Sequence, residues 1–309
     1  MLFLWIAIFI FSLFVLVKGA DYLLFGAEKI GLASGMSQFV VGITIVAVGT
    51  SMPELLTSLL ATFQGLNEYV VATAIGSNVA NIFLIIGLAA ILAKRLIVKK
   101  ELVSLDLPIL SIATALFLVM VIDGKVEFFE SVVLLMAYFT YIIFSIFYKS
   151  ERNVNLKHKP KILLLDILVL ILGIVGLCVG SKYLIDSVVE ISSILNINPT
   201  LIAITVVAVG TSVPELIVSV KAAMRRQSEL AFGNIIGSNI FRVLFMVGLP
   251  GLFSTLKIDS QTYSVGILFL IISTLILVIS AASRRISRQE GSLYIIMYAV
   301  FIAKLFNLF

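Results

Sequence analysis

The chain contains the same motif twice, and this duplication limits its possible folds more than any other feature. Residues 42–54 read GITIVAVGTSMPE and residues 203–215 read AITVVAVGTSVPE, so that Glu54 and Glu215 lie 161 positions apart. The same offset relates further small or polar segments, namely Gly19 with Gly180 and Ile75-Gly76-Ser77-Asn78 with Ile236-Gly237-Ser238-Asn239. A single offset kept over more than fifty residues indicates a duplicated unit. We therefore expect two similar halves, each with one glutamate inside an apolar run.

Composition places the chain in a membrane. Hydrophobic residues make up 61% of it and charged residues only 13%, whereas a soluble domain has roughly 45–50% apolar residues. Apolar runs of about 20 residues recur, which is the length of a bilayer-spanning helix and too long for a barrel strand. The sequence thus predicts an all-α polytopic membrane protein. Its net charge of +5 does not indicate a nucleic-acid partner, because the basic residues sort by loop.

The apolar runs predict ten transmembrane helices, at about 1–27, 37–64, 68–93, 104–122, 127–149, 162–189, 198–224, 229–254, 262–282 and 290–308. A polar linker, 150–161, separates them into two groups of five. The first five-helix repeat is then 1–149, with its motif region at 42–83, and the second is 162–309, with its motif region at 203–244.

Basic residues alternate between the two sides of this topology. Sixteen Lys and Arg residues lie at the loops of one side, and only Lys125 and Lys257 lie at those of the other. The positive-inside rule then predicts a multi-pass protein of the cell membrane, with the linker in the cytoplasm and both termini outside. Five helices per half would give the halves opposite orientations. Such inverted repeats are common in secondary transporters with a midplane site.

The repeated motif has the chemistry of a cation site. Pro53 lacks the N–H that would bond to the carbonyl of Gly49, so we expect loosened backbone there. Thr50 and Glu54 are four residues apart and share a helix face. The second copy repeats this set as Gly210, Thr211, Pro214 and Glu215. These ligands are all oxygens, which favours a hard cation such as Ca²⁺ or Na⁺ over zinc or copper.

Each motif also has a purely structural interpretation. Glu54 and Glu215 would then sit at helix ends near water, although duplication beside a proline and the high cost of intramembrane carboxylates favour function. In the second motif, Ser77 and Asn81 are four residues apart and can face one cavity. Alternatively, the glycine of that motif serves close helix packing.

The paired G-T-S-x-P-E and G-S-N motifs resemble those of the sodium/calcium exchanger family, within the cation/calcium antiporter superfamily. The resemblance covers essentially the whole chain and implies ten helices, of which the second, third, seventh and eighth enclose the ions. It implies that Ca²⁺ is held by Glu54, Glu215, Thr50 and Thr211. It implies Na⁺ sites at Ser51, Ser77, Ser212, Ser238 and the carbonyls of Ala47 and Ala208, with Asn81 completing the centre. The short linker leaves no room for a regulatory domain, as in prokaryotic members.

Arg242 departs from the family pattern, which usually has Asp or Asn there. It follows Ser238 by four residues, so a continuous helix would point it into the same cavity. Arginine keeps its proton, and a buried guanidinium needs a carboxylate partner, so we expect it to pair with a carboxylate, for which Glu54 and Glu215 are the natural candidates. Two glutamates and Arg242 sum to one negative charge. We therefore predict that Arg242 acts as a tethered cation and changes the three Na⁺ per Ca²⁺ that the resemblance implies. The alternative is that it turns aside to carbonyls or water.

The sequence therefore predicts a secondary active cation antiporter that exchanges Na⁺ for Ca²⁺ by alternating access, with both glutamates binding either Ca²⁺ or counter-ions. Proton/calcium exchange, or another cation antiport with stoichiometry altered by Arg242, is the nearest alternative, and a cation channel is a distant one. An enzyme is not expected, because the chain has no HExxH, nucleophile elbow or phosphate loop, and its one histidine, His158, falls in the linker. We expect no resident cofactor and no obligate protein partner, only the ions and the lipid bilayer.

Overall fold

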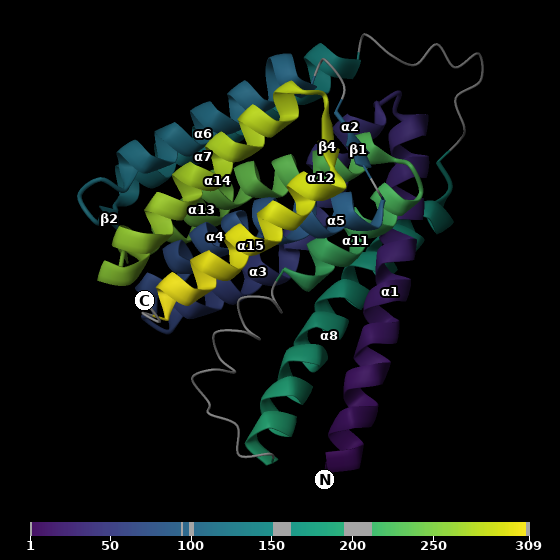
Figure 1. Ribbon diagram of the computed structural model, residues 1–309, viewed down its shortest axis with the longest axis horizontal. Helices are drawn as coiled ribbons and strands as arrows, with labels where there is room; N and C mark the ends of the chain where they lie inside the picture. The colour runs from purple at the N-terminus through teal and green to yellow at the C-terminus, as the bar shows by residue number, and fades with distance from the viewer. Residues whose placement is uncertain (1, 94, 99–101, 151–161, 195–211, 307–309) are drawn as a thin grey trace.

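The computed structural model describes residues 2–93, 95–98, 102–150, 162–194 and 212–306, and these form a bundle of helices (Figure 1). The predicted linker, apart from Ser150, lies outside the described residues. So do residues 198–211 of the seventh predicted helix.

Most predicted helices are present, several of them assembled from consecutive α- and π-helical segments, the latter labelled η. The first half contains α1 (Leu2–Ala33), α2 (Gln38–Val41), η1 (Gly42–Val46), α3 (Ala47–Phe63), α4 (Asn67–Ala80), η2 (Asn81–Ile86), α5 (Gly87–Leu92), η3 (Leu102–Asp106), α6 (Leu107–Met120) and α7 (Phe128–Ser150). The second half contains α8 (Leu164–Ile194), α11 (Val213–Met224), α12 (Ser228–Ile240), η5 (Phe241–Met246), α13 (Val247–Gly251), η6 (Thr262–Gly266), α14 (Ile267–Ala282) and α15 (Arg288–Leu305).

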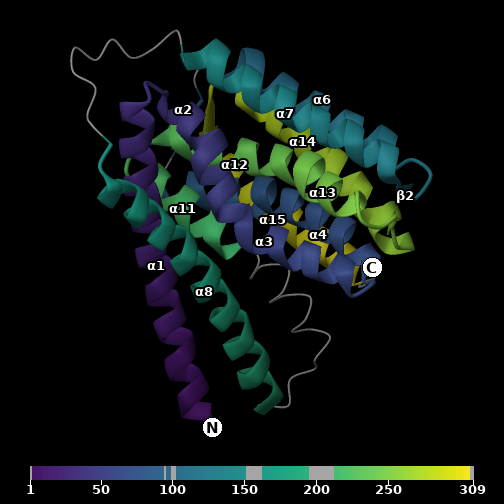
Figure 2. The same cartoon turned by 180° about the vertical axis from the view of Figure 1, so that it is seen from behind.

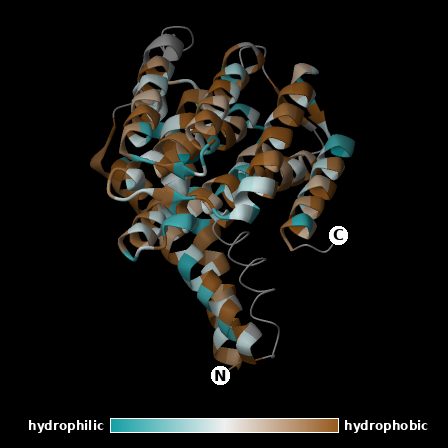
Figure 3. Cartoon of the chain, turned by 90° about the vertical axis from the view of Figure 1, so that its left-hand side faces the viewer, coloured by the Kyte–Doolittle hydropathy of each residue, from teal (hydrophilic) through white to brown (hydrophobic). Residues whose placement is uncertain are grey.

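Hydrophobic residues cover most of these helices, as the brown ribbons of Figure 3 show. Among the described residues, seven helical segments are long and apolar enough to cross a membrane: Leu2–Gly31, Gln38–Phe63, Asn67–Leu92, Phe128–Ile146, Leu164–Ile191, Ser228–Gly251 and Thr262–Ala282. A shorter apolar helix spans Leu107–Met120. The structure thus confirms a helical, multi-pass membrane protein.

The first helix is longer than predicted. Helix α1 continues six residues beyond the predicted end at residue 27. The added turns carry charged residues, which normally end an apolar run, but these residues have partners. Lys29 Nζ lies 2.6 Å from Asp166 Oδ1 of α8, and Glu28 accepts hydrogen bonds from Gln227 at 3.2 Å. Tertiary ion pairing therefore extends the helix past its hydrophobic segment.

The two proline motifs have different helical contexts. Pro53 lies inside α3, which continues through it to Phe63. Pro214 instead lies in the first turn of α11, preceded by a non-helical Ser212 with φ −91° and ψ 3°. A missing N–H is harmless in a first turn. The predicted continuous helix 198–224 is therefore wrong at Ser212, and the described helix begins at Val213.

Two short antiparallel strand pairs connect the halves and were not expected. Strand β1 (Arg95–Ile97) pairs with β4 (Arg285–Ser287), and β2 (Lys125–Val126) pairs with β3 (Leu256–Lys257). Strands of two or three residues are too short to leave a periodic signal. In the predicted topology the members of each pair lie on the same side, so this pairing agrees with the alternation of the loops.

Helices α1 and α8 lie side by side and extend away from the rest of the bundle (Figures 1 and 2). Glycines let their backbones approach closely. A Cβ added at Gly173 would lie 2.4 Å from the Leu23 backbone nitrogen, and one at Gly176 would lie 3.3 Å from Gly19 Cα. Small-residue contacts of this kind hold membrane helices together. The two helices therefore pack as one unit.

Segment η5 follows α12 directly, and the span that contains them is the most deeply buried of the candidate spans. The packing of α12 against η1 is also backbone to backbone. A Cβ at Gly42 would lie 2.9 Å from Gly233 Cα, and one at Gly237 would lie 2.6 Å from Ile43 Cα. This contact joins the motif regions of the two halves at the centre of the bundle.

The turn between α3 and α4 and the turn between α11 and α12 have the same backbone geometry. Gly65 has φ 78° and Arg226, its equivalent at the same offset, has φ 62°. The amide of each donates to the carbonyl three residues before it at 3.0 Å. Glycine adopts this left-handed conformation freely, whereas a residue with a Cβ is strained in it.

We predict that Arg226→Gly raises the thermal unfolding temperature in detergent, because the strain relieved corresponds to a gain of about 0.5–1 kcal/mol in the free energy of unfolding. Gly65→Ala is the matched reverse change and should lower that temperature. No described atom lies within 4 Å of a Cβ added at Gly65, so this variant tests backbone strain alone. Shifts of the same sign in both variants would contradict the explanation.

Candidate functional site

Glu54, Glu215 and Arg242 form an ion triad whose side chains are fully buried. Arg242 Nε donates to Glu54 Oε2 at 2.5 Å, and Nη2 of the same guanidinium donates to Glu215 Oε1 at 2.8 Å. The predicted pairing of Arg242 with a carboxylate is confirmed, and the guanidinium binds both candidate glutamates. One cation thus links the equivalent carboxylates of the two halves.

Three different helical contexts position these charges. Glu54 follows Pro53 in α3, and Glu215 lies in the first turn of α11, where the helix dipole stabilises a negative charge. Arg242 lies in η5, and Asn81, its equivalent in the first half, begins η2. Both halves therefore have a π-helix at the same place, a feature that is frequent at functional sites.

Buried hydroxyl groups complete the surroundings of the carboxylates. Ser77 Oγ donates to Glu54 Oε1 at 3.0 Å, and Ser51 Oγ donates to Glu215 Oε1 at 2.9 Å. The structure therefore brings the two glutamates, the two serines of the first half and Arg242 into direct contact.

Thr50 belongs to a second hydrogen-bonded chain beside the triad. Its Oγ1 lies 3.2 Å from both the Ala47 carbonyl oxygen and Asn234 Oδ1. Asn234 in turn donates to Ser219 Oγ at 2.8 Å. The sequence reasoning missed Ser219, although Ser58 occupies the equivalent position in the first half and is also buried. This repetition could have identified it.

An asparagine cluster joins α4 to α12. Asn78 Nδ2 donates to the Asn239 carbonyl oxygen at 3.0 Å, and Asn81 Nδ2 donates to Asn239 Oδ1 at 2.8 Å. Asn78 and Asn239 are equivalent residues of the two halves, so equivalent positions meet here. Asn81 thus lies in the buried polar centre, as expected, and is held there by the second half.

Several buried polar atoms of this centre make no hydrogen bond to any described residue: Ser212 Oγ, Ser238 Oγ, Glu215 Oε2, Asn81 Oδ1 and Arg242 Nη1. A buried polar atom left unpaired costs about 1–3 kcal/mol. The unpaired atoms of this centre also include Asn78 Oδ1 and Asn239 Nδ2. Most of them are oxygens, which are the ligands that hard cations prefer. Within the described ranges no three His, Cys, Asp or Glu residues cluster, so hydroxyl and amide oxygens would supplement the two carboxylates.

Thr211 and Ala208, which the family resemblance adds to the site, lie outside the described residues. The remaining predicted site residues are all buried, and Ala47 is the first residue of α3.

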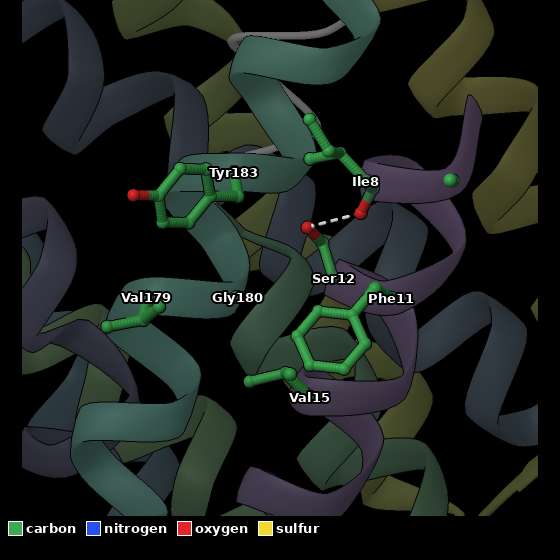
Figure 4. A pocket seen from close by; sticks show the side chains of 8 residues that line it. Ile8, Phe11, Ser12, Val15, Val179, Gly180 and Tyr183 are labelled. Atoms are coloured by element: carbon green, nitrogen blue, oxygen red, sulfur yellow. Dashed lines mark hydrogen bonds between the residues drawn. The ribbon is translucent and has the colours of Figure 1, made fainter. Parts of the chain in front are cut away.

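A separate groove of about 420 Å³ lies between α1 and α8 (Figure 4). Side chains such as Phe11, Val15 and Val179 line it, together with Gly180. The hydroxyl of Ser12 donates to the Ile8 carbonyl of its own helix at 2.7 Å. This apolar groove offers little to a cation, so the buried triad is the candidate ion site.

The family model described as sodium/calcium exchanger protein matches residues 4–147 and 165–307. The chain belongs to the sodium/calcium exchanger family. This exchanger is 34% identical to an uncharacterized membrane protein of Methanocaldococcus jannaschii over 308 residues, covering 99% of each chain. It is 30% identical to the sodium/calcium exchanger MaX1 of Methanosarcina acetivorans, covering 97% of each. A solved structure of the exchanger NCX_Mj superposes with a TM-score of 0.87 at 32% identity, covering 98% of this chain and 99% of that one.

We predict that Arg242→Met destabilises the exchanger in ion-free detergent, because it leaves two buried carboxylates without their partner, at a cost of about 3–5 kcal/mol. The triple variant Glu54→Gln/Glu215→Gln/Arg242→Met removes all three charges and should recover most of the lost unfolding temperature. Thermal unfolding with a chelator present compares the two. A triple variant as unstable as the single one would show that charge balance is not what stabilises the centre.

Proposed function

We propose that this exchanger is a secondary active antiporter of the cell membrane that moves Ca²⁺ against Na⁺. The observation that carries the proposal is the burial of Glu54 and Glu215, from equivalent positions of the two halves, at one point in the bundle. Intramembrane carboxylates are costly and are kept for function. Two of them, with hydroxyl and amide oxygens around them, suit a hard divalent cation.

The relatives support this choice of ions. MaX1 is named a sodium/calcium exchanger, and NCX_Mj was solved after soaking with Na⁺ and Ca²⁺ and also with Na⁺ and Sr²⁺. These ions are cargo rather than cofactors, and the protein transports them without catalysing a reaction.

The ligands are proposed by position. Glu54 and Glu215 bind Ca²⁺ together with Thr50 and Thr211. Besides the two glutamates, the Na⁺ ligands are Ser51, Ser77, Ser212, Ser238 and the carbonyls of Ala47 and Ala208, with Asn81 at the centre. Serine and threonine hydroxyls can rotate, so an oxygen that donates to a carboxylate can turn a lone pair to a cation. Because both ions depend on the same two glutamates, they bind in alternation, which is the requirement for antiport.

The architecture we propose has ten transmembrane helices in two inverted repeats, 1–149 and 162–309, with linker 150–161 in the cytoplasm and the termini outside. Alternating access would come from α1 and α8 sliding together against the helices that hold the triad. Their glycine contacts support movement as one unit. Asp21 of α1 pairs with Lys221 and Arg225 of α11 at 2.8 and 2.7 Å, and these bridges would break as the pair slides.

The experiment uses proteoliposomes loaded with Na⁺ and diluted into Na⁺-free buffer that contains Ca²⁺. We expect Ca²⁺ entry that depends on internal Na⁺. Glu54→Gln and Glu215→Gln should each lower the rate by at least about 10–100-fold, because each removes a charged ion ligand. Glu68→Gln is the matched control, since Glu68 is exposed in the first turn of α4 and should transport normally.

Other outcomes identify other functions. Uptake driven by a pH gradient without Na⁺ would make the protein a proton/calcium exchanger. Ca²⁺ conduction without any counter-ion would make it a channel. Full Na⁺-dependent uptake in Glu54→Gln would contradict the proposed site.

A further inference from the structure

The serines of the centre break the symmetry between the two halves. Ser51 donates to Glu215 and Ser77 donates to Glu54. The repeat offset predicts the corresponding bonds for Ser212 and Ser238, yet the hydroxyl oxygens of both are buried and have no hydrogen-bond partner among the described residues. The glutamates thus bind the serines of one half only.

Arg242 is the position at which the charge differs between the halves at this point. Its equivalent is Asn81, a neutral amide, whereas the Arg242 guanidinium contacts Glu54 Oε2 and Glu215 Oε1. A guanidinium is a fixed positive charge with donors only. It therefore binds both carboxylates as a cation would.

Charge arithmetic sets the guanidinium against Ca²⁺. Glu54 and Glu215 contribute two negative charges, and Arg242 reduces the total to one. Ca²⁺ added to this triad would bring its net charge to +1. The buried guanidinium would also repel the Ca²⁺ strongly at low dielectric. Ca²⁺ also requires six to eight oxygens, and Arg242 offers none while its N–H groups occupy one oxygen of each glutamate. The two cations compete for the same ligands.

Aromatic packing anchors the backbone of Arg242, and its side chain has alternative acceptors in the buried polar centre. Phe241 and Phe245, on either side of it, pack against Tyr138 of α7 with ring centroids 5.6 and 5.0 Å apart, which anchors η5. Its Nη1 has no partner among the described residues. The amide oxygens of Asn78 and Asn81 are likewise buried and without a donor in the described part of the chain, so they can accept the displaced guanidinium.

We propose that Arg242 is a built-in counter-cation of this exchanger, which holds Glu54 and Glu215 in the absence of Ca²⁺ and must leave them for Ca²⁺ to bind. The inference rests on the proposed Na⁺/Ca²⁺ exchange. With the guanidinium in place, one Na⁺ neutralises the two carboxylates. The displaced guanidinium stays in the protein, so the Ca²⁺-bound centre together with Arg242 carries one positive charge. Because uncompensated charge inside the membrane is costly, the guanidinium limits the Na⁺-bound centre to one Na⁺, which sets the exchange at one Na⁺ per Ca²⁺.

Equilibrium accumulation measures this stoichiometry. In proteoliposomes clamped at zero membrane potential with a tenfold Na⁺ gradient, each coupled Na⁺ multiplies the final Ca²⁺ ratio about tenfold by mass action. We expect a ratio of about tenfold in the wild type and about a hundredfold in Arg242→Asn, whose centre takes two Na⁺. Arg242→Lys keeps the charge and should keep the wild-type ratio. A wild-type ratio of a hundredfold or more, or an unchanged ratio in Arg242→Asn, would overturn the proposal, and the wild-type value decides even if that variant does not fold.

Calorimetric Ca²⁺ binding to detergent-solubilised protein tests the competition without transport. Arg242→Asn should bind Ca²⁺ at least about tenfold more tightly than wild type, because no guanidinium has to be displaced. Equal affinities would refute the competition. If the affinities are equal but Glu54→Gln and Glu215→Gln abolish Ca²⁺ binding, only the competition is refuted and the proposed function stands. If these two variants still bind Ca²⁺, both the proposed ion site and this inference are refuted.

Discussion

Two carboxylates buried at one point are the constraint on which the rest of this structure depends. Each would be very costly inside a membrane protein without a nearby positive charge. In this structure, Arg242 supplies that charge by bridging Glu54 and Glu215 with separate nitrogens of one guanidinium. The hydroxyls of Ser51 and Ser77 donate further hydrogen bonds to these carboxylates. A transporter built this way already contains a cation at its centre, and any ion that enters must rebalance the charges.

The duplicated sequence explains how the charges come together. Equivalent residues of the two halves meet across the middle of the bundle, as Asn78 and Asn239 do. Glycine contacts between η1 and α12 bring the motif regions close, and the short strand pairs join loops of opposite halves. The halves are nevertheless not chemically identical, because Arg242 stands where the first half has Asn81. The serines also differ, because Ser51 and Ser77 bind the carboxylates whereas Ser212 and Ser238 have no partner among the described residues.

Much of the fold could be predicted from sequence, because long apolar runs identify membrane helices by length alone. The pairing of Arg242 was also predictable, since a fixed charge four residues from Ser238 needs a nearby carboxylate. The failures have specific causes. Helix α1 runs past its apolar segment because Lys29 pairs with Asp166 of a distant helix. The strands are too short to show a pattern, and Ser219 carries no signal except its equivalence to Ser58.

The sequence by itself determined the membrane class, the duplication and the presence of two costly glutamates with one compensating arginine. These properties follow from hydropathy, spacing and charge, which each residue carries regardless of its neighbours. Only the tertiary structure decided that Arg242 takes both glutamates at once, that Ser51 and Ser77 bind them, and that Ser212 and Ser238 do not. Such choices depend on distances between helices of the two halves. Close glycine packing between the helices fixes these distances. A carboxylate oxygen accepts hydrogen bonds only from donors that the packing places within reach.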